Sequence, residues 1–140
     1  MSRFWVGVAS HDHVLAAVKG GFCQLGHGRE APVRRLAPGD RILYYSPRER
    51  MHDGAVLQAF TAAGEVLEDE VYRVETQTGF RPYRRNVSYL NLGNASIRPV
   101  LPALSFTRDR SSWGQVFRRA SFEITSVDYD QIIQAMIRNS

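Results

Sequence analysis

The chain has 140 residues, of which 44% are apolar and 23% are charged, and its formal net charge is +4. This length predicts a single domain over residues 1–140 that buries its own core. The single cysteine, Cys23, excludes an internal disulfide, so a reducing cytoplasm is the expected location. No apolar run reaches the roughly 18 residues that cross a bilayer, and we therefore expect no membrane partner.

The basic residues are almost all arginine, because Lys19 is the one lysine among the 18. A planar guanidinium group recognises phosphates and base edges better than an ammonium group does. A GC-rich coding bias explains the same ratio equally well. Where the arginines cluster is therefore more informative than how many there are.

The first half of the chain predicts two strands around a short helix. Residues 4–9 are apolar and rich in β-formers, which indicates a strand buried on both faces. A helix over residues 14–18 follows, capped by Ser10 or Asp12 and ended by Gly20 and Gly21. Residues 23–36 are expected to form a long loop, and residues 41–46 the next strand.

The second half predicts further strands and one late helix. The strands are expected over residues 55–62, 66–74, 83–90 and 117–125, with one helical turn within residues 97–106. Asp128 is expected to cap the last helix, with Gln131 in the capping-box position. Its predicted buried stripe is Ile132, Ile133, Met136 and Ile137. This order predicts an α+β fold, a small mixed β-barrel of five to six strands flanked by helices.

Residues suited to catalysis or metal binding do not form a recognised pattern. His11, His13, His27 and His52 lack the spacing of a metal site, so no metal and no cofactor are expected. Cys23 has His27 four residues later, but nothing marks a third catalytic group or an oxyanion hole. We therefore expect the protein not to be an enzyme.

Aromatic and amide side chains at strand ends form the better candidate site. Flat rings and hydrogen-bonding tips are what recognition of an extruded base requires. The candidates are Trp5, Phe22, Gln24, Tyr44, Tyr45, Ser46 and Trp113. Trp5 is expected in the core, and one of the two adjacent tyrosines is expected to be available because they point to opposite faces of their strand.

Two arginine clusters are interleaved with aromatic residues. Arg81, Arg84 and Arg85 lie in the segment FRPYRRN, and Arg108, Arg110, Arg118 and Arg119 flank Trp113. Arginines between rings suit a nucleic-acid strand, with phosphates on the arginines and bases on the rings. The alternative is a solvated surface paired with the acidic run at 65–70.

The ordered segments FWVGVAS, GGFCQLGHG, PGDRILYYSP, QAFTAAGEV, FRPYRRNV and SFEI resemble the EVE domain family, in its stand-alone bacterial form, from about Phe4 to Met136. The resemblance implies a PUA-like barrel related to YTH and ASCH modules. It also implies a pocket for a flipped, often modified base. The matching pocket positions are Ser10, Phe22, Gln24, Tyr45 and Ser46, while His27 and Trp113 match recurrent positions without an assigned role.

These observations lead to one functional hypothesis and two alternatives. The hypothesis is a non-catalytic reader of a modified base, either a modified cytosine in DNA or a modified base in RNA. Phe22 or Tyr45 stacks on the base, polar side chains contact its edge, and phosphates lie on Arg81, Arg84 and Arg85. The alternatives are a binder of a free nucleoside or nucleotide and an enzyme acting on a modified base. The sequence does not indicate an oligomeric state.

Overall fold

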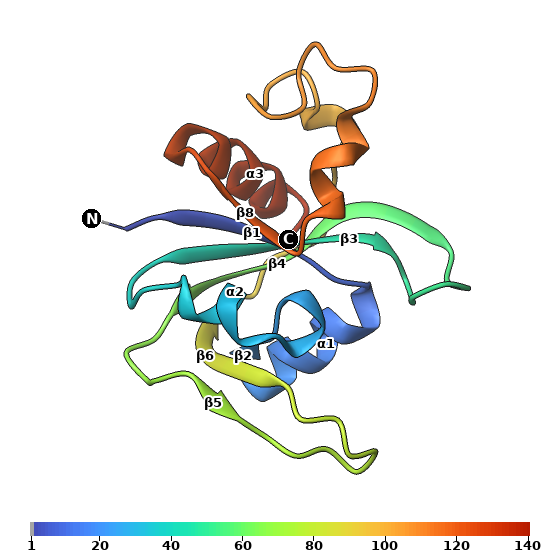
Figure 1. The fold of residues 1–140 in the computed structure, drawn as a ribbon. Helices are drawn as coiled ribbons and strands as arrows, with labels where there is room; N and C mark the ends of the chain where they lie inside the picture. The colour runs from blue at the N-terminus through green and yellow to red at the C-terminus, as the bar shows by residue number, and fades with distance from the viewer. Residues whose placement is uncertain (1) are drawn as a thin grey trace.

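The computed structural model describes residues 2–140. Its strands are spread along the chain, with two α-helices between the early strands and a third after the last strand (Figure 1). The strands are β1 (Phe4–Val8), β2 (Phe22–Cys23), β3 (Arg41–Arg48), β4 (Val56–Val66), β5 (Tyr72–Arg73), β6 (Tyr83–Tyr89), β7 (Ala95–Ser96) and β8 (Ser121–Ile124). The helices are α1 (His11–Gly20), α2 (Glu30–Arg34) and α3 (Ser126–Arg138), with short 3₁₀ turns η1 (Gly26–Gly28), η2 (Arg98–Val100) and η3 (Trp113–Arg118).

Within residues 2–140 the strands form one sheet, in the order β2-β6-β4-β3-β1-β8, with β5 beside β6 and β7 beside β4. β1 and β3 pair in parallel, and the other pairs are antiparallel. The sheet curls but stays open between β2 and β8, so it is a half-barrel. The predicted α+β fold with five to six main strands is confirmed.

The sheet carries a core on each of its two faces. α3 and η2 cover one face, around Phe60, Leu104 and Met136, while α1 and α2 cover the other, around Val14 and Tyr44. Figure 1 shows α3 on one side of β1, β3 and β4, and α1 on the opposite side. Because both faces are covered, the central strands are apolar on both sides, as the sequence of residues 4–9 predicts.

Trp5 is a core residue, as expected, and is 5% exposed. Its indole Nε1 donates a 3.0 Å hydrogen bond to the carboxylate of Asp40, which also accepts the backbone N–H groups of Arg3 and Ala37. Three donors compensate the burial of this carboxylate. The turn before β3 is thereby fastened to β1.

Helix α1 is longer than predicted, but it ends where the glycines predict. Gly21 takes the left-handed conformation, with φ 71°, and its N–H bonds to carbonyls of the last turn. A glycine adopts this conformation at little cost, which explains the stop. At its other end the helix starts directly after Ser10, shortly beyond the end of β1.

Four details of the prediction are wrong. The N-cap of α3 is Thr125 and not Asp128, because Thr125 Oγ1 accepts the Asp128 N–H. The buried face of α3 includes Tyr129 and Ala135, whereas Ile137 is 46% exposed. Residues 67–71 are not a strand, since four acidic side chains at 65–70 favour solvent. Residues 23–36 are not one loop, because they contain η1 and α2.

No helix among residues 2–140 is long and apolar enough to cross a membrane.

Candidate functional site

A pocket of about 630 Å³ opens beside the carboxyl end of β1. Its walls come from α1, the segment after β2, the loop after β3, the turn before β6, and the end of η3. The volume is in the range of sites that hold a small organic group. Four of the seven residues predicted for the base pocket line it together: Ser10, Phe22, Gln24 and His27.

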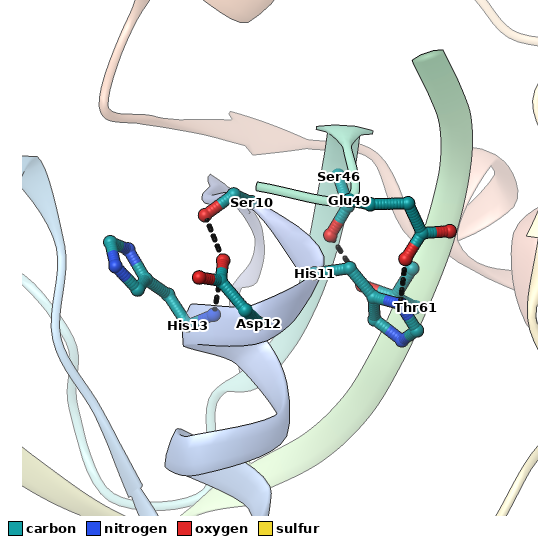
Figure 2. Close-up of polar contacts among 7 residues, drawn as sticks. All are labelled: Ser10, His11, Asp12, His13, Ser46, Glu49 and Thr61. Atoms are coloured by element: carbon teal, nitrogen blue, oxygen red, sulfur yellow. Dashed lines mark hydrogen bonds and ion pairs between the residues drawn. The ribbon is translucent and has the colours of Figure 1, made fainter. Parts of the chain in front are cut away.

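Ser10 lies at the start of α1 with its hydroxyl held by a neighbour (Figure 2). The Oγ atom donates a 2.6 Å hydrogen bond to Asp12, whose carboxylate also accepts the His13 N–H at 2.9 Å. The bond from Ser10 holds the pKa of Asp12 below its usual value, so the carboxylate stays ionised. Ser10 therefore presents an acceptor to the pocket. Its proton goes to a carboxylate and not to an imidazole, which is not the nucleophile–base pair of a serine hydrolase.

Gln24 is positioned from behind by a buried tyrosine. The Tyr44 hydroxyl accepts the Gln24 N–H at 3.1 Å and donates to the Gln24 carbonyl oxygen at 3.2 Å. Tyr44 is 1% exposed, and burial raises the pKa of its hydroxyl, which keeps the proton in place. Gly7 makes room for Leu25 and for this ring, since an added Cβ would lie 2.6 Å from Leu25 Cδ2 and 3.3 Å from Tyr44 Cε1. The backbone of Gln24 is therefore fixed on both sides.

Arg84 closes the same corner of the pocket. Its guanidinium carbon lies 3.9 Å from the centre of the Phe22 ring, and its Nε donates to Gln24 Oε1 at 3.0 Å. Gln24 Oε1 accepts this bond with one of its two lone pairs, and the two N–H donors of the Gln24 amide have no partner of their own among the side-chain bonds of the described residues, so they can donate to a ligand. Phe22, Gln24 and Arg84 thus form one connected unit.

Tyr45 and Ser46 do not line the pocket, and the expectation that they contact a base does not hold. Tyr45 is 2% exposed and stacks on Phe117 with a centroid distance of 3.8 Å, while the Ser46 hydroxyl lies 2.8 Å from that of Thr61. Burial raises the pKa of Tyr45 to about 12. Phe117, which does line the pocket, stands between Tyr45 and the ligand space.

Trp113 also lies outside the pocket. It lines a separate, smaller depression with Phe106 and Arg110, and Arg98 lies over its ring at 5.3 Å. The edge of Trp113 packs on Phe117, with ring centroids 6.4 Å apart. Trp113 therefore packs on the core beneath η3. The prediction that it lines the base pocket is wrong.

Of the three arginines expected to bind phosphate, only Arg84 lines the pocket. Arg85 is 8% exposed, and its Nη1 donates to the Leu36 carbonyl at 2.8 Å, so it fastens α2 to β6. Arg81 is exposed, and its carbonyl accepts a bond from Arg73 in the β5–β6 hairpin. Alternation along β6 explains the result, since adjacent arginines point to opposite faces.

Four other arginines stand at the pocket rim. They come from three separate places in the chain: Arg29, Arg48, Arg118 and Arg119. All four are exposed, and within residues 2–140 none of them forms an ion pair with a carboxylate. No aspartate or glutamate lines the pocket. The rim is thus positively charged, and the sequence did not reveal its arginines as one group, although Arg118 and Arg119 belong to a predicted cluster.

The loop after β3 forms a further wall that the sequence did not indicate. Met51 and His52 line the pocket from this loop. The loop is tied to α1 by the 3.0 Å contact of His11 Nδ1 with Glu49 and by the bond from the Asp12 N–H to the Glu49 carbonyl. The start of α1 and this loop are therefore joined into one wall of the pocket.

The residues considered for catalysis and metal binding are separated. Cys23 is fully buried, and this burial raises the pKa of its thiol to about 12, so it is not a nucleophile. No group of three histidine, cysteine or acidic side chains converges among residues 2–140. His13, His27 and His52 line the pocket at different places.

Comparison with known proteins identifies the family. The family model described as "EVE domain" matches residues 3–135. The chain belongs to the EVE domain family. This EVE domain is 45% identical over 129 residues to the UPF0310 protein in gntR 5'region of Bacillus licheniformis, covering 92% of this chain and 88% of the relative. It is 38% identical to the UPF0310 protein YdcG of Bacillus subtilis, covering 96% and 92%.

Solved structures share the fold of this EVE domain at low sequence identity. A hypothetical protein from Leishmania major superimposes with a TM-score of 0.59 at 12% identity, covering 96% of this chain and 94% of that one. The protein Rpa0253 of Rhodopseudomonas palustris gives a TM-score of 0.56 at 14% identity, covering 96% and 92%. These likenesses establish the fold alone.

Proposed function

We propose that this EVE domain is a non-catalytic reader that holds one flipped base of a nucleic acid in the pocket beside β1. The observation that carries the proposal is a pocket large enough for a base whose lining includes four exposed arginines, none of them ion-paired with a carboxylate within residues 2–140. A neutral small molecule needs only the pocket. A base that is still attached to its phosphates needs both.

The polar groups inside the pocket suit the edge of a nucleobase. Gln24 offers its amide N–H donors, since its oxygen already accepts a bond from Arg84, and Ser10 offers an acceptor, since its hydroxyl donates its proton in a hydrogen bond to the Asp12 carboxylate. A ligand must therefore carry an acceptor and a donor. Cytosine carries an N4 amino donor beside its ring acceptors. The other bases also carry a donor and an acceptor, so these groups suit a base without selecting one, and the family resemblance is what points to a modified cytosine in DNA or to a modified base in RNA.

The rim supports a polymer ligand. Arg29 lies on one side of the mouth after η1, and Arg118 and Arg119 follow from η3. Phe80, at the turn of the β5–β6 hairpin, is 44% exposed and also lines the pocket. An exposed ring beside free guanidinium groups suits stacking on the nucleotide next to the flipped one.

The test is binding to a set of oligonucleotides that differ only in one base, unmodified or modified, at two salt concentrations. We expect one modified base to be preferred and the Gln24→Ala variant to lose about fivefold of that preference, the value of one hydrogen bond of about 1 kcal/mol. Gln134→Ala, an exposed position on α3, is the matched control. An unchanged preference in Gln24→Ala would remove Gln24 from the reading site.

The free-nucleoside alternative is decided in the same experiment. It requires the pocket but not the rim. Charge reversal at Arg118 and Arg119 abolishes oligonucleotide binding by a reader, whereas a nucleoside binder keeps its ligand. Turnover of a labelled modified oligonucleotide would instead reveal an enzyme.

A further inference from the structure

The Phe22 ring is not free to receive a base. Arg84 lies over it, with the guanidinium carbon 3.9 Å from the ring centre. The ring also packs against Gly20, where an added Cβ would lie 2.4 Å from Phe22 Cε2. A base that stacks directly on Phe22 must first displace Arg84.

Arg84 itself is held as a flat surface. Phe22 supports the guanidinium group from one side, and the bond from Nε to Gln24 Oε1 fixes its edge at 3.0 Å. Within residues 2–140 it forms no ion pair, and it lines the pocket. A guanidinium group backed by a ring presents its other face outward, and bases stack on such planes.

We infer that the guanidinium plane of Arg84, supported by Phe22, is the surface on which the bound base stacks. This inference rests on the proposed function and changes the role of both residues. Arg84 contacts the face of the base and not a phosphate, and Phe22 is a positioning residue. Because Arg84 also orients the Gln24 amide, stacking and reading of the base edge are performed by one connected unit.

Substitution by lysine should affect Arg84 and the rim arginines differently. Lysine keeps the charge of an arginine that binds a phosphate, but it has no plane on which a base can stack. Arg84→Lys should therefore preserve the salt dependence of oligonucleotide binding and lose the contribution of the base. At a rim position, Arg118→Lys should preserve both.

The experiment uses two single-stranded DNA 12-mers, one with a single 5-methylcytosine and one with an abasic site at that position. The wild type should prefer the 5-methylcytosine strand, and Arg84→Lys should reduce this preference about 5- to 100-fold, the range of one base stack. A fluorescent base analogue at the same position should be quenched on binding to the wild type and to Arg118→Lys, but much less on binding to Arg84→Lys. Since Arg118→Lys leaves both the Arg84 plane and its bond to Gln24 in place, the comparison of Arg84→Lys with Arg118→Lys isolates the contribution of the plane.

The outcomes distinguish the inference from the function on which it rests. If the wild type binds both strands equally, the pocket holds no base, and both proposals are overturned. If the wild type prefers the base-bearing strand and Arg84→Lys retains both the preference and the quenching, only the stacking role of Arg84 is overturned. Phe22→Leu, which keeps an apolar side chain but removes the ring beneath Arg84, should show a smaller loss of the same kind.

Discussion

Replacing both Arg118 and Arg119 with glutamine should weaken the salt dependence of nucleic-acid binding. The two side chains stand at the end of η3, on the rim of the pocket and without a carboxylate partner in the described chain. Arginines that neutralise phosphates release counterions, so each contributes to the slope of affinity against salt. Neutral glutamine removes that contribution and keeps a polar surface.

The structure sets the size of the effect. If the four exposed rim arginines each meet one phosphate of a single strand, the logarithmic slope is about −2.8, and affinity falls about 50-fold between 50 and 200 mM salt. With two of the four removed, the slope becomes about −1.4, and affinity falls about sevenfold over the same range. Arg84 is left out of this count because it is assigned to the base.

Fluorescence anisotropy with a labelled 12-mer at several salt concentrations measures both slopes. Arg138→Gln, on the exposed end of α3 and outside the pocket, removes one charge of the same kind and should leave the slope unchanged. An equal slope in the wild type and the double variant would refute the assignment of Arg118 and Arg119 to phosphates.

Three further changes test other parts of the account. Tyr44→Phe removes the hydroxyl that holds the Gln24 backbone, so urea denaturation should show a loss of at least about 1 kcal/mol, together with weaker base discrimination. Phe80→Ala should weaken oligonucleotide binding at least about fivefold, while Val127→Ala, at an equally apolar exposed site, should not. Burial raises the pKa of Cys23 from 9.0 to about 12, so between these values the unfolded state loses a proton that the folded state keeps. The free energy of unfolding should therefore fall as the pH rises above 9, by up to about 1.4 kcal/mol per pH unit for this group. Unfolding curves that do not change between pH 8 and 11 would contradict the burial of this thiol.

The part of the site that the sequence predicted is local in the chain. Ser10, Phe22, Gln24 and His27 surround one short helix, and the strand–helix–turn pattern of residues 4–28 places them at the same end of the sheet. A glycine stop and an apolar strand are short-range signals. The predictions made from these signals are confirmed because few distant contacts compete with local preferences.

The residues that sequence analysis misplaced depend on distant packing. Alternation along β3 correctly puts Tyr44 and Tyr45 on opposite faces, but both faces carry a core, so neither ring is exposed. A register shift also lies between these two residues. Arg85 points inward toward α2, a contact across 49 positions of the chain.

The charged rim could not be predicted from the sequence, because it too depends on contacts between distant parts of the chain. Arg29, Arg48 and Arg118 are distant in sequence and meet only because η1, the end of β3 and η3 open onto one pocket. Arg84 and Arg85 of FRPYRRN are adjacent, yet only Arg84 lines the pocket. Proximity in the sequence predicted clusters of arginines, but the folding of the sheet determines which arginines face the same pocket.

The most direct test of a base in the pocket is the resonance of the Gln24 side-chain amide, followed by ¹⁵N–¹H NMR while the 5-methylcytosine 12-mer is added. The account predicts that this resonance shifts on binding, because the amide donors of Gln24 contact the base, and that the amide of Gln134 does not. Binding that leaves the Gln24 amide unmoved while the rim arginine resonances shift would contradict it.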